Sequence, residues 1–306
     1  MLEQTFVQPL MSAAKDMIPS WVSELAPHAA NSRAVPLAGG TRATLDLYHG
    51  DDASMATAVV ANAIGLSAEG LRESVAAVYE AVLGAMKESG FQHPVRMWSF
   101  VPGIHDRLAA GMDRYRLFNL GRYDAFARCL GEPASFANLL PAATAVGHFR
   151  DDLVVCTLGL RRPGVAIENP RQVPASAYSR AHGPRPPCFA RAMVAQLPMG
   201  PRLLVSGTAS IRGEDSVHFG SLPDQLDETF ENLDRLVRSV DGVDRFTLRG
   251  VESARVYFPR ATDRALLTAG VSKRLPESAI TEFVPALICR EELLVEIEAK
   301  LAPEPS

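Results

Sequence analysis

Two features of the sequence could take part in chemistry. The first is a group of arginines on a proline-rich segment. Residues 168–192 read ENPRQVPASAYSRAHGPRPPCFARA, and the prolines exclude one continuous helix or a central strand. Arginine is always charged and meets carboxylates through a planar fork of donors. The chain as a whole is slightly acidic, with a formal net charge of -4, so these arginines are a local feature. We expect them to bind a small anion rather than nucleic acid.

The second feature is a pair of glutamates near the C-terminus, in the stretch LLVEIEAKL. Side chains alternate between the faces of a strand, so Glu296 and Glu298 share one face, while Leu294 and Val295 flank Glu296 with apolar bulk. Burial against apolar neighbours raises the pKa of a carboxyl group, which then keeps its proton near neutral pH. Such a group can serve as a general acid. The alternative is that both glutamates lie on a sheet face open to water.

Residue types that bind metals or act as nucleophiles give no comparable pattern. The cysteines form no CxxC pair, the histidines form no HExxH motif, and no Cys/His spacing matches a zinc site. Phosphate-binding glycine loops are also absent, and the most similar stretch, LAGGTRAT at 37–44, lacks the lysine. We therefore expect no metal, nucleotide or flavin, and we expect the cysteines to be buried free thiols.

The composition of the chain indicates which class of protein carries these groups. The chain has 306 residues, of which 47% are hydrophobic and 22% charged, typical of a globular protein of one large or two ordinary domains. No apolar run approaches the ~20 residues of a membrane span. The first residues, MLEQTFVQPL, lack the basic and apolar regions of a signal peptide. These features predict a soluble, cytoplasmic protein.

Hydrophobic periodicity predicts the elements that position the candidate groups. Apolar residues at helical spacing predict helices over 67–90, 113–131 and 224–240, and a less periodic one over 8–25. Alternating or continuous apolar runs predict strands over 41–50, 93–102, 151–160, 188–197, 201–211, 253–260 and 292–301. This order predicts an α+β fold, with helices packed on one face of a mixed sheet in each half.

Three blocks of the second half resemble the RidA/YjgF family. They are VSGTASI, QLDETFENLDRLV and ICREELLVEIEA, which match a strand-end glycine, a helix and an arginine shortly before a strand. The resemblance implies two RidA/YjgF-like (chorismate mutase-like) halves, 1–160 and 161–306, with most of the active site in the second. It also implies a small-molecule pocket in which Arg290 clamps a carboxylate, and either a monomer or a homotrimer.

A closer resemblance, to the chorismatases, extends from about residue 95 to 300. It rests on RMWSFVP, DRYRLFNLGRYDAF, VGHFRDDLVV, ENPRQVPASAY…GPRPPCFARA, SGTASIRGEDSVH and ICREELLVEIE, which occur in that order. Enzymes of this family cleave chorismate in secondary metabolism. The resemblance therefore implies an enzyme that cleaves the enolpyruvyl ether of chorismate and releases pyruvate.

The resemblance also implies roles for particular residues. Chorismate carries two separate carboxylates, which bidentate arginines suit. The implied acid, which protonates the enolpyruvyl methylene carbon, is Glu296, with Glu298 as the alternative. The implied substrate-binding residues are Arg171, Tyr178, Arg185, Arg191, Thr208, Ser210 and Arg290. From residue type alone, each arginine could instead be a solvated surface group.

The product depends on details near the implied acid. In the family, a cysteine at the place of Cys289 is associated with formation of 3-hydroxybenzoate, which we prefer, so Cys289 is a further candidate catalytic residue. Ala209 is closer to the pattern of the hydrolytic branch, which yields 3,4-dihydroxycyclohexa-1,5-diene carboxylate. A further alternative for the product is 4-hydroxybenzoate. His182 stands where the family more often has tyrosine. Two other functions stay open: a RidA-like imine deaminase, and a non-catalytic protein that binds an aromatic acid.

Overall fold

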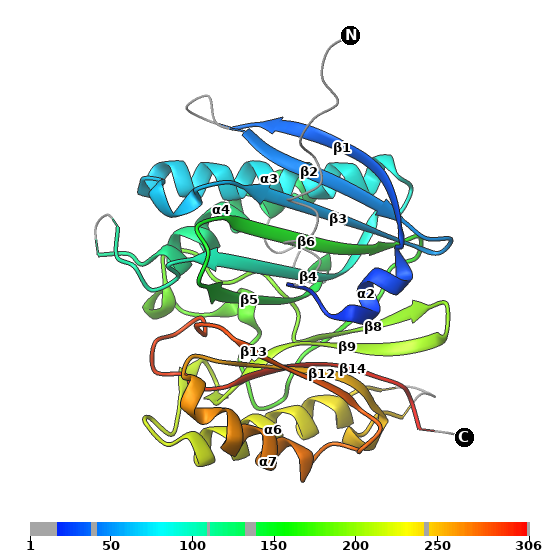
Figure 1. Ribbon diagram of the computed structural model, residues 1–306, viewed down its shortest axis with the longest axis vertical. Helices are drawn as coiled ribbons and strands as arrows, with labels where there is room; N and C mark the ends of the chain where they lie inside the picture. Colours follow the sequence, from blue (N-terminus) through cyan, green and yellow to red (C-terminus); the bar gives the residue numbers. More distant parts are fainter. Residues whose placement is uncertain (1–16, 38–41, 109–110, 132–138, 242–244, 305–306) are drawn as a thin grey trace.

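A computed structural model of the chain describes residues 17–37, 42–108, 111–131, 139–241 and 245–304 (Figure 1). The first half contains, in chain order, α2 (Ser20–Leu25), β1 (His28–Pro36), β2 (Arg42–His49), β3 (Ala53–Val60), α3 (Ala68–Glu88), β4 (His93–Pro102), α4 (Arg114–Leu130), β5 (Ala142–His148) and β6 (Leu153–Leu160). The second half contains β7 (Val165–Ile167), β8 (Ala192–Leu197), β9 (Gly200–Ala209), β10 (Ile211–Arg212), β11 (Asp215–Ser216), α6 (Leu222–Arg238), β12 (Val251–Phe258), α7 (Arg264–Ser272), β13 (Ile280–Pro285) and β14 (Glu296–Leu301).

The two halves repeat one topology. Their six-stranded sheets have the orders β1-β2-β3-β6-β4-β5 and β13-β12-β14-β9-β8-β7. Neighbouring strands are antiparallel except for one parallel pair in each sheet, β4 with β5 and β12 with β13. A parallel pair needs a crossover connection, which α4 and α7 supply. The predicted α+β class, with a mixed sheet and helices in each half, is confirmed.

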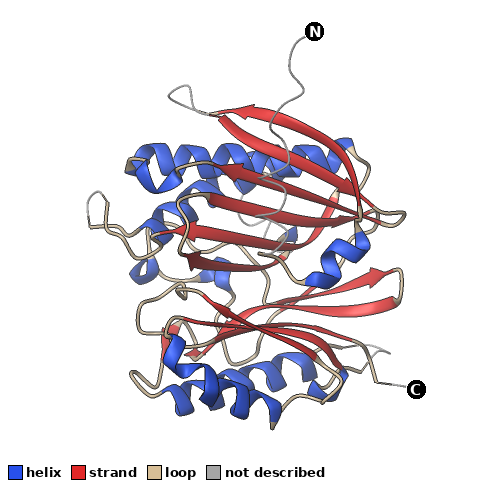
Figure 2. Ribbon diagram, viewed as in Figure 1, coloured by secondary structure: helices blue, strands red, loops and turns tan. Residues whose placement is uncertain are grey.

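Helices cover one face of each sheet, and the opposite faces share a core. Figures 1 and 2 show α3 and α4 behind the first sheet and α6 and α7 below the second. The apolar faces of the helices predicted at 67–90 and 224–240 are buried against their sheets. The shared core joins Trp98 and Val154 of the first sheet to Leu204 and Tyr257 of the second. Because β6 is covered on both faces, every one of its residues is buried, as its continuous apolar run predicts.

Capping residues define the starts of the long helices. The Ser67 side chain accepts a hydrogen bond from the Gly70 amide before α3, and the Asp113 side chain accepts one from the Arg116 amide before α4. Gly131, with φ 92°, ends α4 in a conformation that favours glycine. Every described helix falls short of the length and apolarity needed to cross a membrane.

Some predicted boundaries are wrong. The strand predicted at 292–301 begins only at Glu296, because a turn in which the Leu293 amide donates to the Arg290 carbonyl (3.1 Å) precedes it. Of the helix predicted at 8–25, only α2, which follows Pro19, is helical in the described part, residues 17–25; residues 1–16 lie outside the described residues. The sequence also failed to indicate β3, whose small residues are buried on both faces and do not alternate.

Packing of α3 on the first sheet can be tested by truncation. Leu71 is fully buried between helix and sheet, so Leu71→Ala is expected to lower the free energy of unfolding by about 2–5 kcal/mol. Urea unfolding measures the change. Glu73→Ala, an exposed position of the same helix, is the control and should stay within about 0.5 kcal/mol of the wild type. Equal stability of the two variants would contradict the packing.

Candidate active site

A cavity of about 300 Å³ lies between the two halves and is lined by both. The first half contributes the start of α4, the loop before it and β5. The second half contributes the arginine segment, β9 and the turn before β14. Five of the residues proposed from the sequence line the cavity: Tyr178, Arg191, Cys289, Arg290 and Glu296.

Glu296, the first residue of β14, lies against a glycine of β9. The pairing of the two strands shifts register between Ile297 and Ala299, which places a β-bulge in β9 opposite this part of β14. A Cβ atom on Gly207 would lie 1.9 Å from Glu296 Oε1. Only a residue without a side chain therefore lets the carboxyl group rest on the bulge.

The surroundings of Glu296 favour its neutral form. The residue is 4% exposed, and burial, followed by the negative charge of Glu298, raises the pKa of Glu296 to about 8. The positive charges of Arg96 and Arg191 oppose this shift without cancelling it. The carboxyl group is thus mostly protonated at neutral pH and borders the cavity, as a general acid requires.

Arg191, directly before β8, is held by hydrogen bonds and by aromatic rings. Its Nη2 donates to the Tyr178 hydroxyl (2.8 Å) and the Val173 carbonyl (2.9 Å), and its guanidinium lies over the rings of Tyr178 and Phe189. Its Nε is buried without a partner among the described residues. A buried unpaired donor costs about 1–3 kcal/mol. The Arg191 side chain also lines the cavity, where its guanidinium can meet an anion.

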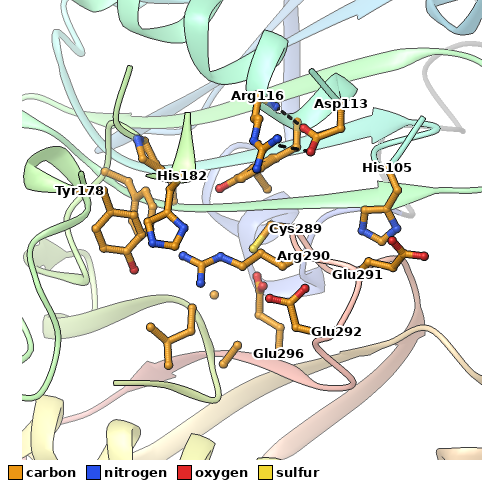
Figure 3. A pocket seen from close by; sticks show the side chains of 18 of the residues that line it. His105, Asp113, Arg116, Tyr178, His182, Cys289, Arg290, Glu291, Glu292 and Glu296 are labelled. Carbon is orange, nitrogen blue, oxygen red and sulfur yellow. Dashed lines mark hydrogen bonds and ion pairs between the residues drawn. The ribbon is translucent and has the colours of Figure 1, made fainter. Parts of the chain in front are cut away.

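Arg290 approaches the same tyrosine ring. Its Nη1 donates to Ser216 Oγ (3.1 Å), its Nη2 donates to the Glu214 carbonyl (2.8 Å), and its guanidinium lies 5.7 Å from the Tyr178 ring centroid. Figure 3 shows Arg290 pointing across the cavity between His182 and Glu296. Burial and the nearby Arg290 charge lower the pKa of His182, which favours the neutral imidazole.

Cys289 borders the cavity beside Arg290 and Glu296 (Figure 3). Burial, and next the carboxyl group of Glu296, raise the pKa of the Cys289 thiol to about 12. The thiolate, which is the nucleophilic form, is therefore scarce near neutral pH. Cys289 can shape the cavity or exchange weak hydrogen bonds, but it is not activated for attack. Among the described residues, no group of His, Cys, Asp and Glu side chains is arranged to hold a metal ion.

Sequence reasoning missed the contribution of the first half to the cavity. Tyr115, Arg116 and Arg122 of α4 line it, with His105 from the preceding loop, whose Nε2 lies 2.7 Å from the Ile288 carbonyl. Arg122 is 1% exposed, and its Nε has no partner among the described residues. The available signal was an arginine within the buried face of a predicted helix, since charged residues are rarely buried without a partner.

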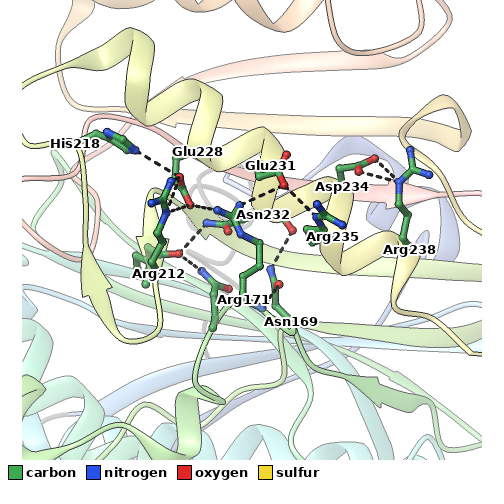
Figure 4. A network of polar contacts seen from close by, with 12 residues as sticks. Asn169, Arg171, Arg212, His218, Glu228, Glu231, Asn232, Asp234, Arg235 and Arg238 are labelled. Carbon is green, nitrogen blue, oxygen red and sulfur yellow. Dashed lines mark hydrogen bonds and ion pairs between the residues drawn. The ribbon is translucent and has the colours of Figure 1, made fainter.

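Arg171 lies outside the cavity, in a polar network that joins the arginine segment to α6 (Figure 4). Its Nη2 is 2.8 Å from Glu228 Oε1, and Glu228 also accepts hydrogen bonds from Arg212. The backbone amide of Arg171 donates to Asn169, whose side chain donates to the Asn232 carbonyl in α6. These contacts fix the start of the segment.

Three further residues predicted to bind substrate also lie away from the cavity. Arg185 is exposed, with its guanidinium 4.6 Å from the Tyr123 ring centroid. Thr208 donates to the Ser206 carbonyl, and Ser210 donates to the Val217 carbonyl. Strand alternation explains the last two, because Gly207, Ala209 and Ile211 face the cavity and the residues between them point away.

Glu298, the alternative acid, does not line the cavity either. Its two carboxylate oxygens accept hydrogen bonds from Arg96, Trp98 and Thr144. An arginine and two neutral donors therefore occupy both of its oxygens, away from any ligand in the cavity. Of the two glutamates, Glu296 is therefore the one placed to donate a proton to a ligand.

Comparison with known proteins identifies the family. Residues 34–159 match the family described as "Chorismatase FkbO/Hyg5-like, N-terminal". A chorismatase and a 3-hydroxybenzoate synthase from Streptomyces hygroscopicus are each 34% identical to this chain, over 75% and 74% of it and 67% and 68% of their own lengths. A solved chorismatase structure matches with a TM-score of 0.74 and 30% identity, covering 90% of this chain and 80% of that one. The chain belongs to the chorismatase family.

The buried acid predicts a pH-dependent stability difference. Because the pKa of Glu296 rises from 4.5 to about 8 on folding, the native state binds more protons than the unfolded state in that interval. Its contribution to stability is therefore complete below pH 4.5 and is lost as the pH rises to about 8. Relative to the wild type, Glu296→Gln should gain stability between pH 5 and 8, as measured by urea unfolding.

The control for this prediction is Glu277→Gln, a change at an exposed glutamate. Its stability should follow the wild type at every pH, because the Glu277 side chain is already in water. A constant difference between Glu296→Gln and the wild type across the pH range would contradict the raised pKa of Glu296.

Proposed function

We propose that this chain converts chorismate, cleaving its enolpyruvyl ether and releasing pyruvate together with a hydroxybenzoate. The observation that carries the proposal is a buried carboxyl group, Glu296, which faces a cavity that also presents the guanidinium groups of Arg191 and Arg290 and whose raised pKa favours the neutral form. Family membership supports the substrate, because two relatives bear the name chorismatase.

Binding uses the cations that surround the cavity. Arg191 and Arg290 both line the cavity and both approach the Tyr178 ring, so each can meet a carboxylate of the substrate. Arg122 of α4, which also lines the cavity, offers a cation from the first half. Separate cations suit the two separate carboxylates of chorismate. Tyr178 holds the Arg191 guanidinium with its hydroxyl and ring, so little side-chain freedom is lost on binding.

Chemistry begins with proton transfer from Glu296 to the methylene carbon of the enolpyruvyl group. The resulting oxocarbenium ion is attacked by water or by the ring hydroxyl of the substrate, and pyruvate leaves. The atoms of chorismate equal those of a hydroxybenzoate plus pyruvate, so the aromatising branch consumes no water overall. The hydrolytic branch consumes one water and leaves the ring as a dihydroxycyclohexadiene carboxylate.

The preferred aromatic product is 3-hydroxybenzoate. Support comes from the neutral thiol of Cys289 in the cavity and from the relative named 3-hydroxybenzoate synthase. Ala209, which also lines the cavity, fits the hydrolytic alternative, and 4-hydroxybenzoate is a further alternative. Chromatography of the products separates the three outcomes.

One coupled assay distinguishes the proposal from its rivals. Purified protein is given chorismate, and pyruvate is measured together with the aromatic product. An imine deaminase would instead release ammonia from imino acids, and a binding protein would release nothing. We also propose that residues 1–160 and 161–306 are two domains. A cytoplasmic location and a monomeric or homotrimeric state stay predictions.

Loss of the acid should remove turnover. General acids contribute roughly 10²–10⁴-fold, so Glu296→Gln is expected to reduce pyruvate release by about that factor. In the wild type, kcat/KM should fall about tenfold per pH unit above about pH 8, where Glu296 loses its proton. A Glu296→Gln variant that keeps both the wild-type rate and the wild-type pH profile would exclude Glu296 as the acid.

A matched pair of arginines tests the placement of the anion. Arg191→Gln removes a cation from the cavity and should raise KM for chorismate by about tenfold to a hundredfold. Arg171→Gln removes a cation of the same segment that is bound to α6, so KM should change by less than about twofold while the protein loses stability. Equal effects of the two substitutions on KM would count against this binding mode.

A further inference from the structure

A second polar cluster adjoins the cavity without lining it. Glu298 Oε2 accepts hydrogen bonds from Arg96 Nη2 (2.7 Å) and Thr144 Oγ1 (2.6 Å), and Glu298 Oε1 accepts one from Trp98 Nε1 (2.9 Å). All four residues are at most 3% exposed. The reaction proposed above assigns no role to these four residues.

The cluster crosses the boundary between the two halves. Arg96 and Trp98 come from β4 and Thr144 comes from β5, whereas Glu298 comes from β14. A buried ion pair is expensive to desolvate, and apolar residues of similar volume often serve stability as well. Stability by itself is therefore a weak reason for placing charges here.

A chain of contacts links the cluster to the acid. The Thr144 hydroxyl donates its hydrogen to Glu298, which leaves the Thr144 oxygen free to accept a hydrogen bond from the Gly207 amide (3.0 Å). Gly207 forms part of the bulge on which the Glu296 carboxyl group rests. The position of Thr144, fixed by Glu298, thus fixes the backbone behind Glu296.

We propose that Arg96, Thr144 and Glu298 form a positioning unit, which fixes the bulge behind Glu296 and holds the Glu298 carboxylate beside it. None of the three lines the cavity, so the unit acts through the acid and not on the substrate. The proposal rests on the proposed function, in which Glu296 is the acid.

The charged groups that face Glu296 determine the direction of the expected effects. Glu298, on the same strand, raises the pKa of Glu296, whereas Arg96 from β4 and Arg191 from the arginine segment lower it. The Cys289 thiol is neutral. Removal of the Glu298 charge also leaves Arg96 uncompensated beside the acid. Both consequences lower the pKa of Glu296.

The first experiment is Glu298→Gln. The pH above which kcat/KM falls should move down by one unit or more, which is about a fivefold loss at pH 8 and about a tenfold loss well above it. KM below that pH should change less than about twofold, because Glu298 does not line the cavity. A folded Glu298→Gln protein with the wild-type pH profile would overturn the proposal.

An infrared titration separates this proposal from the proposed function. The protonated-carboxyl band that Glu296→Gln removes should titrate at a lower pH in Glu298→Gln than in the wild type. An unchanged titration overturns the positioning unit even if the enzyme turns over chorismate. A shifted titration in a protein that releases no pyruvate supports the unit and rejects the proposed function.

The second experiment needs no buried charge to be left unpaired. Thr144→Val removes the hydroxyl that joins Glu298 to Gly207, and kcat should fall by at least about tenfold with KM within about twofold. Thr144→Ser restores the hydroxyl and should restore kcat. The control is Thr157→Val in β6, where a buried hydroxyl has no partner among the described residues. Wild-type kcat in Thr144→Val, or no rescue by serine, contradicts the proposal.

Discussion

The structure depends on one unfavourable placement, a carboxyl group buried where the two sheets meet. Water would stabilise the charged form of Glu296, so its exclusion favours the proton-bearing form. That exclusion requires close approach of β14 and β9, which the absence of a side chain at Gly207 permits. Most other features of the site either keep water from this group or bring an anion to it.

Four arginines near the site form two pairs with different roles. Arg191 and Arg290 line the cavity around the ring of Tyr178, and hydrogen bonds to Tyr178 and to Ser216, respectively, orient the two guanidinium groups. Such preorganisation lowers the entropic cost of binding. Arg171 instead pairs with Glu228, and Arg96 pairs with Glu298. Those two pairs order the segment and the bulge that the cavity needs.

The repeated topology explains why the cavity lies at the boundary between the halves. Each half covers one sheet face with helices and leaves the other face to be buried against its counterpart. Along most of this contact the side chains are apolar and fill the space. Where polar residues of α4, the arginine segment and the turn before β14 meet, a cavity is left. A site of this kind requires both halves, because neither half alone encloses Glu296.

The sequence determined the features that follow from short-range periodicity. The long helices, the buried strand β6 and the α+β class were predictable because apolar residues recur at the periods of a helix and a strand. The alternation of LLVEIEAKL likewise placed Glu296 and Glu298 on one face.

Only the tertiary structure distinguished residues that look alike in sequence. Glu298 accepts hydrogen bonds from three donors of β4 and β5, about 150–200 residues away in the chain, whereas Glu296 meets a glycine and the cavity. Arg171 and Arg191 share one segment, yet a partner on α6 removes only the first from the cavity. The contribution of α4 was hidden for the same reason. Local pattern fixes which way a side chain faces, but the group that it meets is set by contacts distant in sequence.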